Sequence, residues 1–151
     1  MTDYLESTVD KFIFKVATDR HYANDGLWVK PEEGSGIVRV GLSDFLQQSN
    51  GDVAFADVRP AGTVLAVGDD LASIETIKVA MVLLSPVAGT IVEKNPAMIP
   101  RPELINQDPY GEGWLARIET GDWEAARTRL MDPRAYFVMM KGQAEEEAKK
   151  L

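Results

Sequence analysis

Short stretches of alternating apolar and polar residues recur along most of the chain. Residues 36–42 (GIVRVGL) alternate with a period of two, which is typical of a strand with one buried face. Turn sequences rich in glycine and proline, such as RPAG and SPVAG, separate the apolar runs that follow. Strands are expected at residues 11–16, 36–42, 53–58, 63–68, 71–77, 79–84, 90–95 and 114–119. Short, closely spaced strands of this kind predict a mainly β fold, either a sandwich or a barrel.

Helical signals replace the alternation towards the C-terminus. Asp122 can cap a helix over residues 123–131. Asp132 followed by Pro133 begins a second helix that extends to about Lys150, because proline is favoured at the first helical position. We expect the apolar side of this tail to pack on the β region. The alternative is that it is a docking element for a partner.

One short helix is also expected inside the β region. Ser43 can cap a helix over residues 44–49, and Gly51 can end it. The pattern therefore predicts a mainly β domain over residues 1–120, with a short internal helix, and a helical C-terminal extension over residues 121–151.

Composition narrows the classes of function. The 151 residues suffice for one domain with an appendage, and the formal net charge of −8 argues against a nucleic-acid partner. The acidity allows a basic docking partner, but it can equally reflect solubility alone. No apolar run approaches the roughly 18 residues of a membrane span. The start MTDYLESTVDK lacks the features of a signal peptide, so we expect a cytoplasmic protein without membrane segments.

Most catalytic chemistries lack their side chains here. The chain has no cysteine, which excludes disulfides, thiolate catalysis and cysteine metal sites. His21 is the only histidine, and we expect it to be an ordinary loop or surface residue. None of the motifs G-x-S-x-G, G-x-x-x-x-G-K-[ST] or G-x-G-x-x-G is present. No catalytic residue and no metal ligand is therefore predicted, and an enzyme is the least favoured class.

Lys78 is the only cation in the apolar segment IETIKVAMVLLSPVAGTI, residues 74–91. The strands on both sides of it predict a hairpin with its tip near residues 76–79. Ile77 and Val79 are β-branched and stiffen the backbone of that tip. A lysine held clear of the body in this way suits an attachment post better than a binding pocket. From position alone, an ordinary solvated surface lysine is the alternative.

Three motifs around and after this lysine follow one another at a defined spacing. They are E-[ST]-x-K, S-P-x-x-G and P-E-L-x-N-x-D-P-Y-G-x-G-W. Their residues here are Glu75, Thr76 and Lys78; Ser85, Pro86 and Gly89; and Pro102, Glu103, Leu104, Asn106, Asp108, Pro109, Tyr110, Gly111, Gly113 and Trp114. Over roughly residues 28–120 the chain resembles the H protein of the glycine cleavage system and its lipoate-bearing relatives.

This resemblance implies a lipoyl-domain-like hybrid barrel-sandwich and a non-catalytic carrier. We expect a monomer, because a carrier that visits several active sites is best served by being monomeric. The resemblance also implies lipoic acid bound covalently through an amide to Lys78, which would remove the lysine charge. Glu75, Thr76, Ile77 and Val79 would form the hairpin that a lipoate ligase or the lipoyl synthesis enzymes recognise. For Glu75, a hydrogen bond that fixes the hairpin and a merely solvated charge are alternatives.

Some segments depart from the family pattern. The family's H-E-W segment is altered, because YANDGL separates His21 from Trp28, and VAMVLLSPV after the lysine is unusually apolar. The start DKFIFKVATDRHY and the tail AYFVMMKGQAEEEAKKL look more like the lipoate-binding proteins of sulfur oxidation. We therefore expect an arm that carries sulfur between a heterodisulfide-reductase-like complex and sulfurtransferases. The first alternative is an aminomethyl shuttle among the glycine cleavage enzymes, and the second is an unmodified β interaction module.

Overall fold

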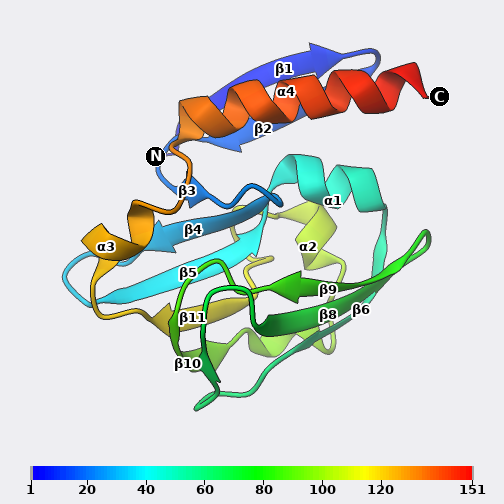
Figure 1. Ribbon diagram of the computed structural model, residues 1–151. Coiled ribbons are helices and arrows are strands. Elements are labelled where there is room, and N and C mark those ends of the chain that lie inside the picture. The colour runs from blue at the N-terminus through cyan, green and yellow to red at the C-terminus, as the bar shows by residue number, and fades with distance from the viewer. Residues whose placement is uncertain (1, 151) are drawn as a thin grey trace.

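Two antiparallel sheets face each other across the main hydrophobic core (Figure 1). The computed structural model describes residues 2–150. Its strands are β1 (Tyr4–Val9), β2 (Phe12–Ala17), β3 (His21–Tyr22), β4 (Leu27–Pro31), β5 (Ile37–Leu42), β6 (Val53–Val58), β7 (Val64–Leu65), β8 (Asp70–Thr76), β9 (Ala80–Leu84), β10 (Gly89–Lys94) and β11 (Ala116–Glu119). Its helices are α1 (Asp44–Asn50), the 3-10 turn η1 (Pro96–Met98), α2 (Leu104–Gln107), α3 (Trp123–Arg127) and α4 (Pro133–Lys149). The predicted mainly β fold is confirmed.

The larger sheet has six strands in the order β3-β4-β5-β11-β10-β7, and the smaller has three in the order β6-β8-β9. Alternate residues of both sheets point inward, as the period-two pattern predicts. Val38 and Val40 of β5 meet Leu71 and Ile74 of β8 in one fully buried cluster. This core supports the β8–β9 hairpin that carries Lys78.

Three strands, β1, β3 and β4, lie where the sequence pattern predicted no strand. β4 was missed because Leu27, Trp28 and Val29 are all buried, so the segment shows no alternation. β3 pairs with β4, and Tyr22 lies opposite Trp28. β1 pairs with β2 in a separate two-stranded sheet. By contrast, the strand expected at 63–68 has only two residues, because the residues after it form a turn.

The predicted helix caps are present. Ser43 Oγ accepts a hydrogen bond from Leu46 N at 3.3 Å at the start of α1. Asp132 Oδ1 accepts one from Ala135 N at 2.8 Å at the start of α4. α3 ends at Arg127, before the expected residue 131, because Met131 forms a β-bridge with Tyr22. A helical conformation at residue 131 would break that bridge.

The C-terminal helix packs on the N-terminal hairpin, above the sandwich (Figure 1). Tyr136 and Met140 of α4 are buried against Phe14 and Val16 of β2. Tyr136 also stacks on Tyr22, with ring centroids 4.4 Å apart. This second core joins segments from both sides of residue 120. The domain boundary expected at residue 120 stays a prediction. No helix within residues 2–150 is long and apolar enough to cross a membrane.

Candidate functional site

Lys78 lies at the tip of the β8–β9 hairpin, in a turn that the side chain of Thr76 closes. Thr76 N donates to Val79 O at 2.8 Å. Thr76 Oγ1 accepts hydrogen bonds from Lys78 N and Val79 N, both at 3.1 Å. One hydroxyl therefore satisfies two backbone donors of the tip, which explains how an exposed turn keeps a defined shape.

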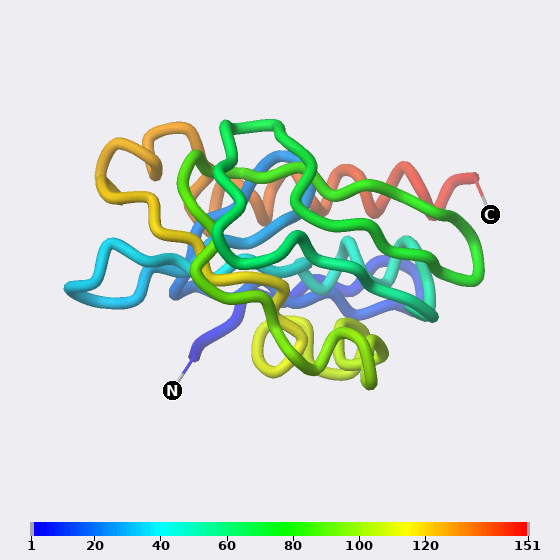
Figure 2. Tube along the Cα trace, turned by 90° about the horizontal axis from the view of Figure 1, so that it is seen from below, coloured from blue at the N-terminus to red at the C-terminus, as the bar shows by residue number. Residues whose placement is uncertain are grey.

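The tip contacts the last turn of α1 and the loop that follows this helix. Ile77 N donates to Asp52 O at 3.2 Å, and Lys78 Nζ donates to Ser49 O at the same distance. Figure 2 shows the β8–β9 tip and the C-terminal ends of α1 and α4 at one end of the molecule. Ile77 remains 77% exposed, so the tip rests on its support without being buried.

Asn106 fixes the loop on which the tip rests. Its Nδ2 donates to Gly51 O and to Gln47 Oε1, each at 3.0 Å. Its Oδ1 accepts from Val53 N at 2.8 Å, and Val53 lies opposite Thr76 in the β6–β8 pairing. The sequence marked Asn106 only as a motif residue. The structure shows that it connects the short α2 to the support of the hairpin.

The rest of the same motif block holds the N-terminal segment on the sandwich. Trp28 Nε1 donates to Pro109 O at 2.9 Å, and the Tyr110 hydroxyl donates to Lys15 O at 2.7 Å. Burial raises the pKa of Tyr110, so its hydroxyl stays protonated as a donor. The guanidinium of Arg20 lies over the rings of Trp28 and Tyr110, at 4.5 and 5.1 Å from their centroids. These contacts are structural.

The structure brings the predicted site residues together at one tip. Glu75 is exposed on β8, opposite Phe55 of β6 and Ala80 of β9. Val79 is 41% exposed, so the tip carries two exposed apolar side chains, those of Ile77 and Val79. The side chain of Glu75 is exposed to solvent, where a partner can contact it.

His21 belongs to a different part of the molecule. Its ring packs edge-on against Trp123, with centroids 5.4 Å apart, and burial lowers the pKa of its imidazole. It is half-buried in β3, so the expectation of a loop or surface residue was wrong about the element. Across residues 2–150, no three His, Cys, Asp or Glu side chains gather closely enough to hold a metal ion.

The surroundings of Lys78 fit an amide-linked lipoyl group. The side chain is exposed, and Nζ has a neutral carbonyl, Ser49 O, as its hydrogen-bond partner. An amide at Nζ keeps one N–H that can serve the same carbonyl. Ser49 O can therefore keep a hydrogen-bond donor after the lysine has lost its charge.

Comparisons with known proteins point in one direction. The model of the family "Glycine cleavage H-protein" matches residues 20–143. The glycine cleavage system H protein of Bacteroides thetaiotaomicron is 39% identical over 121 residues, which cover 80% of this chain and 94% of that protein. The one of Carboxydothermus hydrogenoformans is 35% identical over 130 residues, covering 86% and 98%. The crystal structure of a glycine cleavage system H protein from Mycobacterium marinum matches with a TM-score of 0.68 and 30% identity, over 79% of this chain and 94% of that one.

Proposed function

The chain belongs to the glycine cleavage H-protein family, and from this premise we propose that it shuttles an aminomethyl group on a lipoyl arm attached to Lys78. Proteins of this family are non-catalytic carriers with lipoic acid bound covalently to a lysine. When bound, the lipoyl group supplies a strained cyclic disulfide that partner enzymes can open. The chain itself contributes the attachment lysine and the surface around it.

The observation that carries the choice of Lys78 is the closed tip on which it stands. Thr76 fixes the backbone on both sides of the lysine, and Ile77 and Val79 restrict it further. The amine is thereby presented at an exposed position with a small, neutral contact at Ser49 O. A lipoylating enzyme can reach such a group without unfolding any packed segment.

Recognition by that enzyme would involve the exposed side chains beside the lysine. Glu75 offers a negative charge on the outer face of β8, and Ile77 and Val79 offer apolar surface. We assign Thr76 to the shape of the tip and Glu75, Ile77 and Val79 to contact with a lipoate ligase or with the lipoyl synthesis enzymes.

We propose an aminomethyl cargo in place of the sulfur cargo that the sequences of the two termini suggested. The relatives of this chain are named glycine cleavage system H proteins, and they match most of its length. No comparison supports a heterodisulfide-reductase-like complex or sulfurtransferases as partners. Aminomethyltransferase and glycine decarboxylase, the enzymes of glycine cleavage, are accordingly the partners we propose.

Intact-mass measurement of the protein made in a lipoylation-competent cell tests the attachment site. We expect a shift of one lipoyl amide in the parent and in Lys94→Ala, which removes an exposed lysine of β10, but none in Lys78→Ala. Absence of the shift in the parent, with several lipoate ligases supplied, would leave the unmodified interaction module.

The cargo is tested with the lipoylated protein. Glycine labelled at its methylene carbon, incubated with glycine decarboxylase, should transfer that carbon to the chain, and Lys78→Ala should receive none. Transfer of sulfur from a sulfurtransferase, without transfer of the glycine carbon, would restore the sulfur-carrier interpretation.

A further inference from the structure

The edge strand β9 lacks the features that usually protect the open edge of a sheet. It pairs with β8 on one side, and within residues 2–150 no strand pairs with it on the other. Its sequence AMVLL has no charged residue and no proline, and Val82 and Leu84 are 49% and 42% exposed. Natural edge strands usually carry charges, prolines or bulges, because unpaired backbone groups allow another chain to add to the sheet.

The opposite edge of the same sheet is protected in these ways. β6 has a bulge between Val53 and Phe55, and Asp57 adds a charge to the strand. Val53 N also donates to Asn106 Oδ1 at 2.8 Å, so this backbone donor is already used. β9 therefore differs from the other edge strand of its own sheet.

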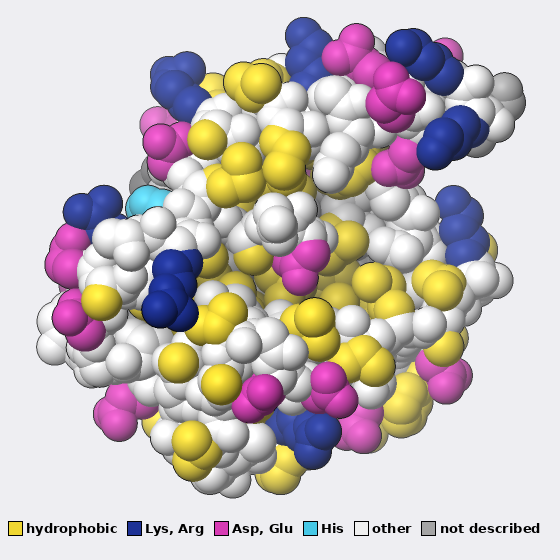
Figure 3. Space-filling view, viewed as in Figure 1, with side chains coloured by type: hydrophobic (Ala, Val, Ile, Leu, Met, Phe, Trp, Pro, Cys, Tyr) yellow, Lys and Arg dark blue, Asp and Glu magenta, His cyan; other side chains and the backbone are white. Residues whose placement is uncertain are grey.

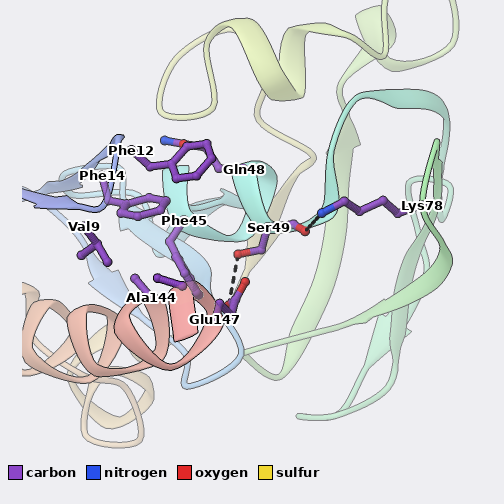
Figure 4. A pocket seen from close by; sticks show the side chains of 10 residues that line it. Val9, Phe12, Phe14, Phe45, Gln48, Ser49, Lys78, Ala144 and Glu147 are labelled. Atoms are coloured by element: carbon purple, nitrogen blue, oxygen red, sulfur yellow. Dashed lines mark hydrogen bonds between the residues drawn. The ribbon is translucent and has the colours of Figure 1, made fainter. Parts of the chain in front are cut away.

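The N-terminal hairpin is protected by side chains. Gln48 Nε2 donates to Ile13 O, and Lys15 N donates to Asp44 Oδ2, both at 2.9 Å, so two side chains of α1 use backbone groups of β2. Figure 4 shows the small groove that remains between this hairpin, α1 and α4. That groove beside Lys78 is walled by side chains, unlike the open edge of β9.

The register of the β8–β9 hairpin shows which backbone groups of β9 face outward. At the tip, Thr76 N donates to Val79 O at 2.8 Å. Beyond the other end of β9, Ser85 N donates to Asp69 O at 2.7 Å. Val79 and Ser85 therefore face β8 with their backbone groups. Along an antiparallel strand, successive residues face the partner strand and the opposite side in turn.

The N–H and C=O groups of Met81 and Leu83 consequently face β8, whereas those of Ala80, Val82 and Leu84 face the open edge. Within residues 2–150, no hydrogen bond to a group beyond this hairpin involves the backbone of residues 80–84. The edge thus presents alternating donors and acceptors with which another extended chain can pair.

There is space for such a chain beside β9, on the face shown in Figure 3. A hollow of about 440 Å³ is lined by Leu84 and Pro86 on the β9 side and by Met131 on the other. A second hollow, of about 790 Å³, shares Asn24 and Asp25 with the first and extends between α1 and α4. Each volume lies within the range of about 300–1,000 Å³ that is typical of binding sites.

The charge around these hollows favours a basic occupant. Their acidic lining residues are Asp25, Glu146 and Glu147, and their cations are Arg129 and Lys150. The whole chain has a formal net charge of −8, which attracts a basic partner over a distance. A second copy of the chain would bring the same negative charge to this edge and is disfavoured.

We propose that the open edge of β9 binds an extended segment of a basic partner protein, which adds to the sheet as a further strand. Hydrogen bonds to Ala80, Val82 and Leu84 would hold its backbone, and alternate apolar side chains would contact Val82 and Leu84. The paired groups begin at Ala80, two residues after Lys78, so the tip stays free. Such a partner would lie next to the proposed attachment site without covering it.

A short peptide that alternates valine with lysine, acetylated and amidated at its ends, is the probe for this edge. Binding to the full-length chain is measured by isothermal titration calorimetry. A twin peptide with alternate backbone nitrogens methylated keeps the side chains but loses donors, and we expect its Kd to be at least about ten-fold higher. A twin with glutamate in place of lysine should also bind about ten-fold more weakly.

Hydrogen exchange of single amides, followed by NMR, tests the binding mode. In the free chain, the amides of Met81 and Leu83 should exchange slowly and those of Ala80, Val82 and Leu84 rapidly. Saturation with the lysine peptide should slow exchange of the latter three at least about ten-fold. A peptide that merely contacts exposed side chains would leave this alternation unchanged and would contradict the proposal.

Substitutions at Val82 separate the edge from the fold. Val82→Pro removes an outward N–H that the β8–β9 ladder does not use, so the fold should persist while the peptide binds about ten-fold more weakly. Val82→Lys keeps the N–H but adds a charge that repels the basic peptide, and should weaken binding in the same direction. The matched control Val138→Lys places this charge on α4, at a 72% exposed position, and should leave the Kd within about two-fold.

The possible outcomes decide for or against the edge. Unprotected amides at about 1 mM lysine peptide, or equal affinity for the methylated twin, would overturn the proposal. A dimer of the chain in analytical ultracentrifugation, dissociated by Val82→Lys, would assign the edge to a second copy instead. None of these measurements needs the lipoyl arm, so their failure leaves the proposed carrier function untouched, and a chain without lipoyl attachment would leave the edge proposal standing.

Discussion

The hairpin tip at residues 76–79 and the motif block at residues 102–114 differ strongly in how much of their surface is buried. The tip is exposed. It is held in place by Thr76, by one contact with the last turn of α1 and by one contact with the loop that follows α1. In the block, Leu104, Ile105 and Trp114 are buried, and Asn106 makes three hydrogen bonds. Both regions belong to the same set of sequence motifs.

This difference shows that a family motif can combine two physical roles. In the block, large residues and close approaches of the backbone specify the fold, and a change there should reduce stability. At the tip, the proposed chemistry needs one exposed amine on a stiff turn, and little buried surface depends on it. Substitutions should therefore separate stability from lipoyl attachment.

Gly113→Ala should have the largest effect on stability. A Cβ at this position would overlap the carbonyl oxygen of Leu104 and lie 2.9 Å from that of Asp108, and backbone atoms cannot move aside cheaply. We expect the free energy of unfolding to fall by about 3 kcal/mol, measured by urea denaturation. A loss below about 1 kcal/mol would show that the block is far more adaptable than its packing suggests.

Asn106→Ala should have the next largest effect. It leaves Val53 N and Gly51 O without the partners that the amide provides, at a cost of about 2 kcal/mol in the free energy of unfolding. Thermal and urea denaturation measure the loss. The control is Gln107→Ala at the exposed neighbouring position, for which we expect a change below about 0.5 kcal/mol. Equal effects of the two substitutions would contradict the proposed structural role of Asn106.

Gly142→Ala should change stability in the opposite direction. A Cβ here meets nothing within 4 Å, and the residue lies inside α4. Alanine restricts the unfolded chain and favours the helix, so we expect a gain of about 0.5–1 kcal/mol in the free energy of unfolding. A decrease measured in the same denaturation experiment would mean that α4 needs flexibility at this point.

Lys78→Ala should change stability least and attachment most. The exposed side chain makes one hydrogen bond, so the free energy of unfolding should change by less than about 0.5 kcal/mol. The lipoyl mass shift should disappear completely, whereas Gly142→Ala should keep it. A large loss of stability in Lys78→Ala would remove the contrast between the tip and the block.

Hydrophobic periodicity predicted the central strands well because their burial alternates. The strand expected at residues 53–58 matches β6, and the hairpin on either side of Lys78 matches β8 and β9. Periodicity failed for β4, whose residues Leu27 to Val29 are buried on both faces, and for the two-residue β3. The helix starts at Asp122 and Asp132 were readable because capping is a local interaction.

The functional site was also only partly predictable from the sequence. The position of Lys78 at a stiff hairpin tip could be predicted from the local sequence, because Ile77, Val79 and the flanking strands are adjacent to it in the chain. The termini led the sequence interpretation to a sulfur cargo, whereas the relatives match the body of the chain and favour glycine cleavage. The terminal segments are better explained by their structure, because β1, β2 and α4 form a second core over the sandwich.

The sequence by itself determined the mainly β architecture, the caps of the helices and the exposed lysine, because each depends on neighbours a few residues apart. Only the tertiary structure decided that Asn106 supports the loop beneath the tip, across more than fifty residues of chain from Gly51. It alone also placed Phe12, Phe45 and Ala148 around one groove beside Lys78. Contacts between distant segments depend on how sheets and helices pack, and no local pattern encodes that packing.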